Sequence, residues 1–171
     1  CPQSDSQILD LSALEGLPIK ELDLSTTGVS DLSPLRALDL TTLVLRGTPV
    51  EDLTPLSGLP IRELDLGFTR VANLAGLQGI PLTKLGLRNL KITDLEPVED
   101  APIRELDLAF NPIESLRCLR EMPLRVLNLF KVPVDDIAPL RNMKLEELHL
   151  SGTGVKSIRP LRGMPLRSIF L

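Results

Sequence analysis

The chain has 171 residues, of which 38 are leucine and four are phenylalanine, with no tyrosine or tryptophan. A hydrophobic content of 43% beside 25% charged residues excludes a disordered chain, and no apolar run is long enough for a membrane-spanning helix. One histidine and two cysteines are too few for an ordinary zinc site, and a net charge of −4 argues against general binding to nucleic acid.

Residues 1–17 have the pattern of an incomplete repeat. Apolar side chains recur at every third position and continue the pattern of the segment that follows: Ile8, Leu11, Leu14 and Leu17. Cys1 is typical of a bacterial lipoprotein whose signal peptide has been removed, and a fragment boundary would look identical. The localisation is therefore open between a lipid-anchored cell-surface protein, a cytoplasmic protein and a part of a larger protein.

Residues 18–171 consist of seven full units of 21 residues and a truncated eighth, within a single solenoid domain. Six prolines are separated by 21 residues or a multiple of that number: Pro18, Pro60, Pro81, Pro102, Pro123 and Pro165. We number each unit from 1 to 21 and call the residues that share one position a column. Columns 2, 5, 7, 12, 15, 18 and 21 contain Leu, Ile, Val, Met or Ala in every unit. This regularity predicts a repeat solenoid, because no compact fold imposes it over so many turns.

Each unit predicts one strand followed by a turn. In the first unit, residues 21–25 alternate between polar and apolar, which is the period of a strand. Leu22 and Leu24 are predicted to point inward, while Glu21 and Asp23 point outward.

The second half of each unit predicts a short helical return, since its apolar residues are spaced at three and suit a 3-10 turn. Ser33 and Thr54, each followed by a proline, have the pattern of an N-cap residue with Pro at the first helical position. In four units an aspartate lies three residues before the proline of the return and is predicted to cap or close the turn: Asp31, Asp52, Asp94 and Asp136.

The pattern Leu22-x-Leu24-x-x-Thr27-x-Val29 resembles the core of the leucine-rich repeat, and residues 50–56 resemble the return segment of bacterial internalin-type repeats. The resemblance covers essentially the whole chain, in a 21-residue variant. It implies an α/β repeat solenoid: a right-handed superhelix with a parallel, concave sheet of about eight strands and short 3-10 returns on the convex side. It also implies a protein that binds other proteins through the concave face.

One column departs from the family pattern. The asparagine of the family is mostly threonine here and is retained only as Asn111. Leu90 and Val132 have no polar side chain at this position. We therefore expect the ladder of side-chain hydrogen bonds to lapse at those two repeats.

All four phenylalanines lie in columns that face outward: Phe68 and Phe110 in column 9, Phe130 in column 8 and Phe170 in column 6. His149 shares column 6 with Phe170. Aromatic side chains outside the core predict a partner-binding patch, centred on Phe110, Phe130, His149 and Phe170. The alternative is that the column-9 rings pack over the corner onto the adjacent repeat.

Asp23, Asp65 and Asp107 share column 6 in every second unit. A spacing of roughly 10 Å from the strand separation is too wide for one metal ion or a catalytic pair. They form either a solvated charged face or an acidic lane that selects a basic partner.

Charge is uneven along the chain, because residues 101–171 carry 11 Lys/Arg against 8 Asp/Glu. Much of the positive charge lies on the convex return: Arg117, Arg120, Arg141, Arg159 and Arg162. These cations either stabilise the ends of the helical turns or dock an acidic surface or another domain.

The sequence predicts a non-enzymatic protein that recognises a protein or peptide, without cofactor, metal, nucleic acid or small-molecule substrate. The partner-binding residues are predicted as Phe110, Phe130, His149, Phe170, Phe68, Asp107, Asp65 and Asp23. The alternative is a structural spacer in a larger multidomain bacterial protein, for example one that is kinase-linked or surface-anchored. The apolar C-terminal end, with Leu166, Ile169 and Leu171, has the pattern of an uncapped layer. It is expected either in a chain cut from a longer protein, or where another domain caps this end, or where the chain associates with itself through it. Cys118 is predicted to behave as a small apolar residue that is too distant to pair with Cys1.

Overall fold

The computed structural model describes residues 8–171, and Cys1 lies outside them. Eight strands form one parallel sheet in which each strand pairs with its neighbours in the sequence. Their bounds are β1 (Glu21–Asp23), β2 (Thr42–Val44), β3 (Glu63–Asp65), β4 (Lys84–Gly86), β5 (Glu105–Asp107), β6 (Val126–Asn128), β7 (Glu147–His149) and β8 (Ser168–Phe170). The register is in step with the repeat, as in the pairing of Leu22 with Leu43, so each column forms a straight row across the sheet.

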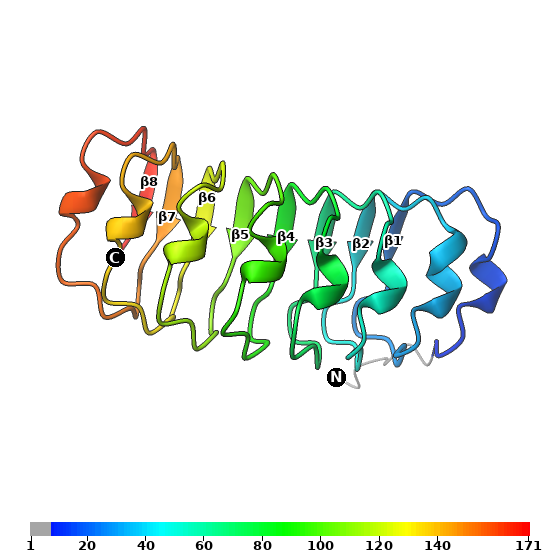
Figure 1. Cartoon of the computed structure of the whole chain (residues 1–171). Coiled ribbons are helices and arrows are strands. Elements are labelled where there is room, and N and C mark those ends of the chain that lie inside the picture. The colour runs from blue at the N-terminus through cyan, green and yellow to red at the C-terminus, as the bar shows by residue number, and fades with distance from the viewer. Residues whose placement is uncertain (1–7) are drawn as a thin grey trace.

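The return segments lie on the opposite side from the sheet, and Figure 1 shows the row of short helices in front of the row of strands. Each return contains one 3-10 helix. Their bounds are η1 (Ser12–Leu14), η2 (Ser33–Ala37), η3 (Thr54–Leu56), η4 (Ala75–Leu77), η5 (Glu96–Val98), η6 (Arg117–Leu119), η7 (Ala138–Leu140) and η8 (Arg159–Leu161). We call the two sides the sheet face and the helix face.

The predicted closing role of the aspartates is confirmed. The backbone N–H of Thr54 donates to the Asp52 carboxylate over 2.8 Å, and Asp31 accepts in the same way from Ser33. The prediction that Ser33 and Thr54 are N-caps is wrong, because both residues lie inside their helices. The aspartate carboxylate, two residues earlier, reaches the free N–H groups without a hydroxyl acting as a cap.

The core consists of the seven predicted apolar columns, stacked between the sheet and the helices. Leu43, Leu64 and Leu85 are buried in the same row. Burial falls in the outermost C-terminal layer, where Ile158 and Ile169 are 49% and 39% exposed. Within residues 8–171, no helix has the length and apolar character needed to cross a bilayer.

Column 10 stabilises the corner after each strand in two different ways. The Thr48 hydroxyl donates to the Leu45 carbonyl within its own repeat over 2.7 Å. The Asn111 side chain reaches the preceding repeat, where it accepts from the backbone N–H groups of Leu90 and Ile92. The Asn111 side chain therefore joins two repeats. It supplies the hydrogen-bond acceptor that the apolar Leu90 side chain cannot provide to the backbone of its own repeat.

Candidate functional site

Phe68 and Phe110 lie at the corner that follows β3 and β5, with backbone φ angles of +63° and +62°. The sheet ladder fixes this conformation, because the Phe68 N–H donates to the Arg88 carbonyl of the next repeat and the Phe110 N–H donates to the Phe130 carbonyl. A left-handed backbone is unfavourable for a residue with a bulky side chain.

The same corner exists without an aromatic ring elsewhere in the array. Gly47 and Gly152 occupy column 9 with φ angles of +68° and +76°, and Asn89 has +57°. Glycine adopts this conformation freely and asparagine adopts it more readily than other residues. The fold therefore requires the left-handed turn and does not require phenylalanine there.

Each of these rings belongs to a recurring group of three side chains: the ring, an arginine and an aspartate. Arg46 lies over the Phe68 ring, 5.4 Å from its centroid, and bonds to Asp65 over 3.1 Å. Two repeats later, Arg88 lies 5.0 Å from the centroid of the Phe110 ring, and its guanidinium is 3.8 Å from Asp107. In both groups the cation of one repeat stacks on the ring of the next and pairs with its column-6 aspartate.

The second group extends to a further ring and a further cation. The Phe110 and Phe130 rings meet edge to face, with centroids 5.2 Å apart. The Lys131 ammonium lies 5.4 Å from both centroids. Cations over aromatic faces are attracted by the ring quadrupole. We call Phe68, Phe110 and Phe130 the aromatic rim.

His149 and Phe170 form a separate pair on β7 and β8. Their rings are stacked, with centroids 4.1 Å apart and planes 18° from parallel. The His149 Nε2 atom lies 2.7 Å from a Glu147 carboxylate oxygen. The predicted aromatic patch is thus arranged as two pairs, Phe110 with Phe130 and His149 with Phe170, with Phe68 further along the rim and 46% exposed.

Each of the three predicted aspartates accepts a hydrogen bond from the turn that follows its own strand. Asp65 accepts from the Gly67 N–H, and Asp107 accepts from the Ala109 N–H. Asp23 accepts from the hydroxyl and the N–H of Ser25, and these two bonds lower the pKa of its carboxyl, the hydroxyl contributing more. Arg46 pairs with Asp65, and the Arg88 guanidinium lies 3.8 Å from Asp107. Asp23 is in no ion pair among residues 8–171.

A shallow hollow of about 400 Å³ crosses the sheet face from β2 to β7. Its floor includes Gly86, between Asp65 and Asp107 on the two adjacent strands. A Cβ atom on Gly86 would lie 2.8 Å from the Asp65 carboxylate, so the aspartate side chain leans over the glycine. The sheet face is recessed at its middle because Gly86 adds no side chain to the row.

Within the described residues, no three His, Cys, Asp or Glu side chains come together in a way that would hold a metal ion. Cys118 is the middle residue of η6, and burial raises the pKa of its thiol.

No family model matches the sequence, and a comparison with curated proteins gives no match. The fold is similar to that of internalin C2 from Listeria monocytogenes, with a TM-score of 0.91 and 25% identity over 96% of this chain and 76% of that one. The chain has an internalin-like leucine-rich-repeat fold. InlF, a second Listeria monocytogenes internalin, has a TM-score of 0.82 at 23% identity. That alignment covers 95% of this chain and 51% of InlF.

The internalin-like comparison confirms the predicted fold, a right-handed repeat solenoid with a parallel sheet and 3-10 returns. Sequence reasoning missed the cations over the rings, although Arg46 and Arg88 were visible in column 8 one repeat before each column-9 phenylalanine. It also missed the recess at Gly86, which the single glycine in column 6 indicates.

Proposed function

We propose that the internalin-like chain is a non-catalytic recognition module that binds a protein or peptide through the sheet face and its aromatic rim. The observation that supports this proposal is the placement of Phe68 and Phe110 at left-handed corners that Gly47 and Asn89 occupy elsewhere. Thr26 and Lys131 adopt the same left-handed turn, so the ring and the arginine stacked on it distinguish these two positions. Phe68 is 46% exposed and Phe110 is half-buried, and aromatic residues and arginine are enriched at protein interfaces.

The recessed sheet face is suited to the same role. Its hollow spans six strands, so a bound segment can lie across the repeats while the aromatic rim and the His149–Phe170 pair contact it from two places. The side chains of Asp65 and Asp107 are each 31% exposed, which allows these ion pairs to exchange partners with a ligand at small cost.

A structural spacer is the rival function, and one observation favours it. The Phe110 ring already contacts Phe130, Arg88 and Lys131 of its own chain. Rings that fill space between repeats in this way would stabilise the array and leave no need for an outside ligand.

The experiment that separates the two is selection from a displayed random-peptide library against the whole chain. The double variant Phe110→Asn with Phe130→Ser replaces both rings with residues of types found in the same columns, Asn89 and Ser25, and so preserves the corner geometry. Recognition predicts enriched peptides that lose binding to the variant while its thermal unfolding stays within a few degrees. A spacer predicts a marked loss of stability and no enriched peptide that distinguishes the two proteins.

A further inference from the structure

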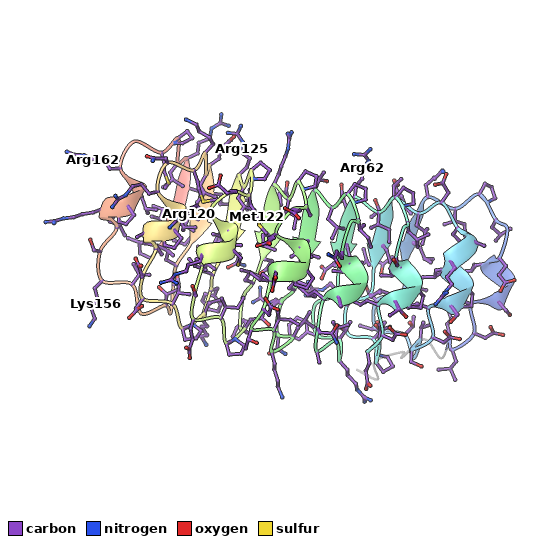
Figure 2. The ribbon with its side chains drawn as sticks, in the orientation of Figure 1. Arg62, Arg120, Met122, Arg125, Lys156 and Arg162 are labelled. Carbon is purple, nitrogen blue, oxygen red and sulfur yellow. The ribbon has the colours of Figure 1, made fainter. Side chains whose placement is uncertain are left out.

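The helix face of the fifth to seventh repeats carries five arginines, which we call the arginine stripe: Arg117, Arg120, Arg141, Arg159 and Arg162. All five side chains are exposed. None of them takes part in an ion pair within the described part of the chain. Figure 2 shows Arg120 and Arg162 on the side of the helices, away from the strands.

The fold does not require arginine at these positions. Ser57, Gln78 and Glu99 occupy the same column as Arg120 in the second to fourth repeats. The hydrogen bond that closes the helix has the same form in each case, from the Ser57 N–H to Thr54 at 3.2 Å and from the Arg120 N–H to Arg117 at 3.3 Å. A glutamate is accepted where a cation would be favoured, so the helix end does not explain the arginines.

A hollow of about 660 Å³ lies within the stripe, between Arg120 and Arg141. Met122, Pro139 and Met143 contribute apolar surface to it, and all three are buried. Figure 2 shows Met122 directly beside Arg120. Methionine adapts its shape to a neighbour, so this hollow suits an apolar side chain held between two guanidinium groups.

Carboxylates border the stripe and narrow the choice of partner. Glu121 lines the hollow, and the exposed Asp135 and Asp136 precede η7 on the same face. A nucleic acid duplex or an anionic membrane presents a broad field of phosphates, which these carboxylates would repel. A single extended chain is narrower, and of these three carboxylates only Glu121 lines the hollow in which it would lie.

We propose that the arginine stripe and its hollow dock an acidic segment of a protein partner, with carboxylates on Arg120, Arg141 and Arg162 and an apolar side chain in the hollow. The planar guanidinium group presents paired donors that match a carboxylate. This surface lies on the opposite face from the aromatic rim, so the proposal stands independently of the function proposed above.

The test measures fluorescence anisotropy of a fluorescein-labelled peptide in which pairs of glutamates alternate with leucine. We expect it to bind the whole chain and to lose at least about tenfold in affinity with the triple variant Arg120→Glu, Arg141→Glu and Arg162→Glu, because like charges replace complementary ones. Arg36→Glu is the matched control, since Arg36 occupies the same column at the other end of the array. It should bind the peptide as the unaltered chain does.

Three results would overturn the proposal. The first is equal affinity for the unaltered chain and for the triple variant. If charge reversal alters the unfolding temperature, the triple Arg→Gln variant replaces it in this comparison. The second is equal binding of a peptide with glutamine in place of glutamate. The third is tighter binding of single-stranded DNA or phosphatidylserine vesicles than of the acidic peptide at the same ionic strength. The Phe110→Asn, Phe130→Ser variant should keep peptide binding, which separates this surface from the sheet face.

Discussion

The side-chain amide nitrogen of Asn111 donates a hydrogen bond to the carbonyl oxygen of Leu87, one repeat earlier, over 2.7 Å. The same nitrogen also donates to the Leu108 carbonyl, and the amide oxygen accepts from the N–H groups of Leu90 and Ile92. One buried side chain thereby joins the backbones of the fourth and fifth repeats. Repeats of a solenoid are stabilised mainly by their neighbours, so this junction affects the whole array.

Replacing Asn111 with valine should therefore destabilise the chain more than a matched change in another repeat. The variant leaves the buried N–H groups of Leu90 and Ile92 without acceptors, at a cost of about 2–4 kcal/mol. Thr48→Val is the control, because the Thr48 hydroxyl makes one bond within its own repeat and its loss costs about 1 kcal/mol. Urea unfolding measures both. Equal losses would mean that the inter-repeat bonds of Asn111 add nothing.

The left-handed corner predicts a reciprocal pair of effects in column 9. Thr26 has a φ of +57° with a branched side chain, whereas Gly47 adopts +68° in the next repeat. Thr26→Gly should stabilise the chain by about 1 kcal/mol, and Gly47→Thr should destabilise it by a similar amount. A Cβ on Gly47 meets its nearest atom, the Thr26 methyl carbon, at an ordinary 3.6 Å, so the cost comes from the backbone. Thermal unfolding of the two variants checks the signs, and a shift in the same direction would contradict the explanation.

The fold was predictable because apolar columns repeat with a fixed period, and any register other than the observed one would expose a row such as that of Leu43, Leu64 and Leu85. The site was less predictable, since it depends on contacts between repeats. Arg46 stacks on Phe68 across a repeat boundary, and the sequence alone does not say which of its neighbours an exposed arginine will meet. The strain at Phe68 also depends on a φ angle that only the backbone ladder fixes.

The recess at Gly86 predicts a substitution whose effect depends on Asp65. Alanine is normally tolerated better than glycine in a strand. Here the new methyl group would lie 2.8 Å from the Asp65 carboxylate and displace it from the Gly67 N–H. We expect Gly86→Ala to destabilise the chain by about 1 kcal/mol and to be neutral or stabilising in an Asp65→Ala background. A double-mutant cycle by urea unfolding measures the coupling, and additive effects would contradict the predicted contact.

The aspartates that close the helical turns predict how stability depends on pH. The pKa values of Asp31 and Asp52 are lowered below 3.8, first by the backbone N–H groups of Ser33 and Thr54 and then by the hydroxyls of the same residues. A carboxyl whose pKa is lower in the folded state stabilises it above the unfolded value and loses that effect as the pH falls through the folded value. Stability contributed by these groups should therefore be intact at neutral pH and decline below about pH 4.

The matched variant is Asp31→Asn with Asp52→Asn, because Asn73 occupies the same column in the third repeat and accepts from the Ala75 N–H over 3.2 Å. The amide keeps the hydrogen bond and removes the titration. Urea midpoints at neutral pH and at about pH 3 should show a smaller acid-induced loss in the variant than in the unaltered chain. An identical decline in both proteins would mean that other carboxylates, such as Asp23, govern the acid sensitivity.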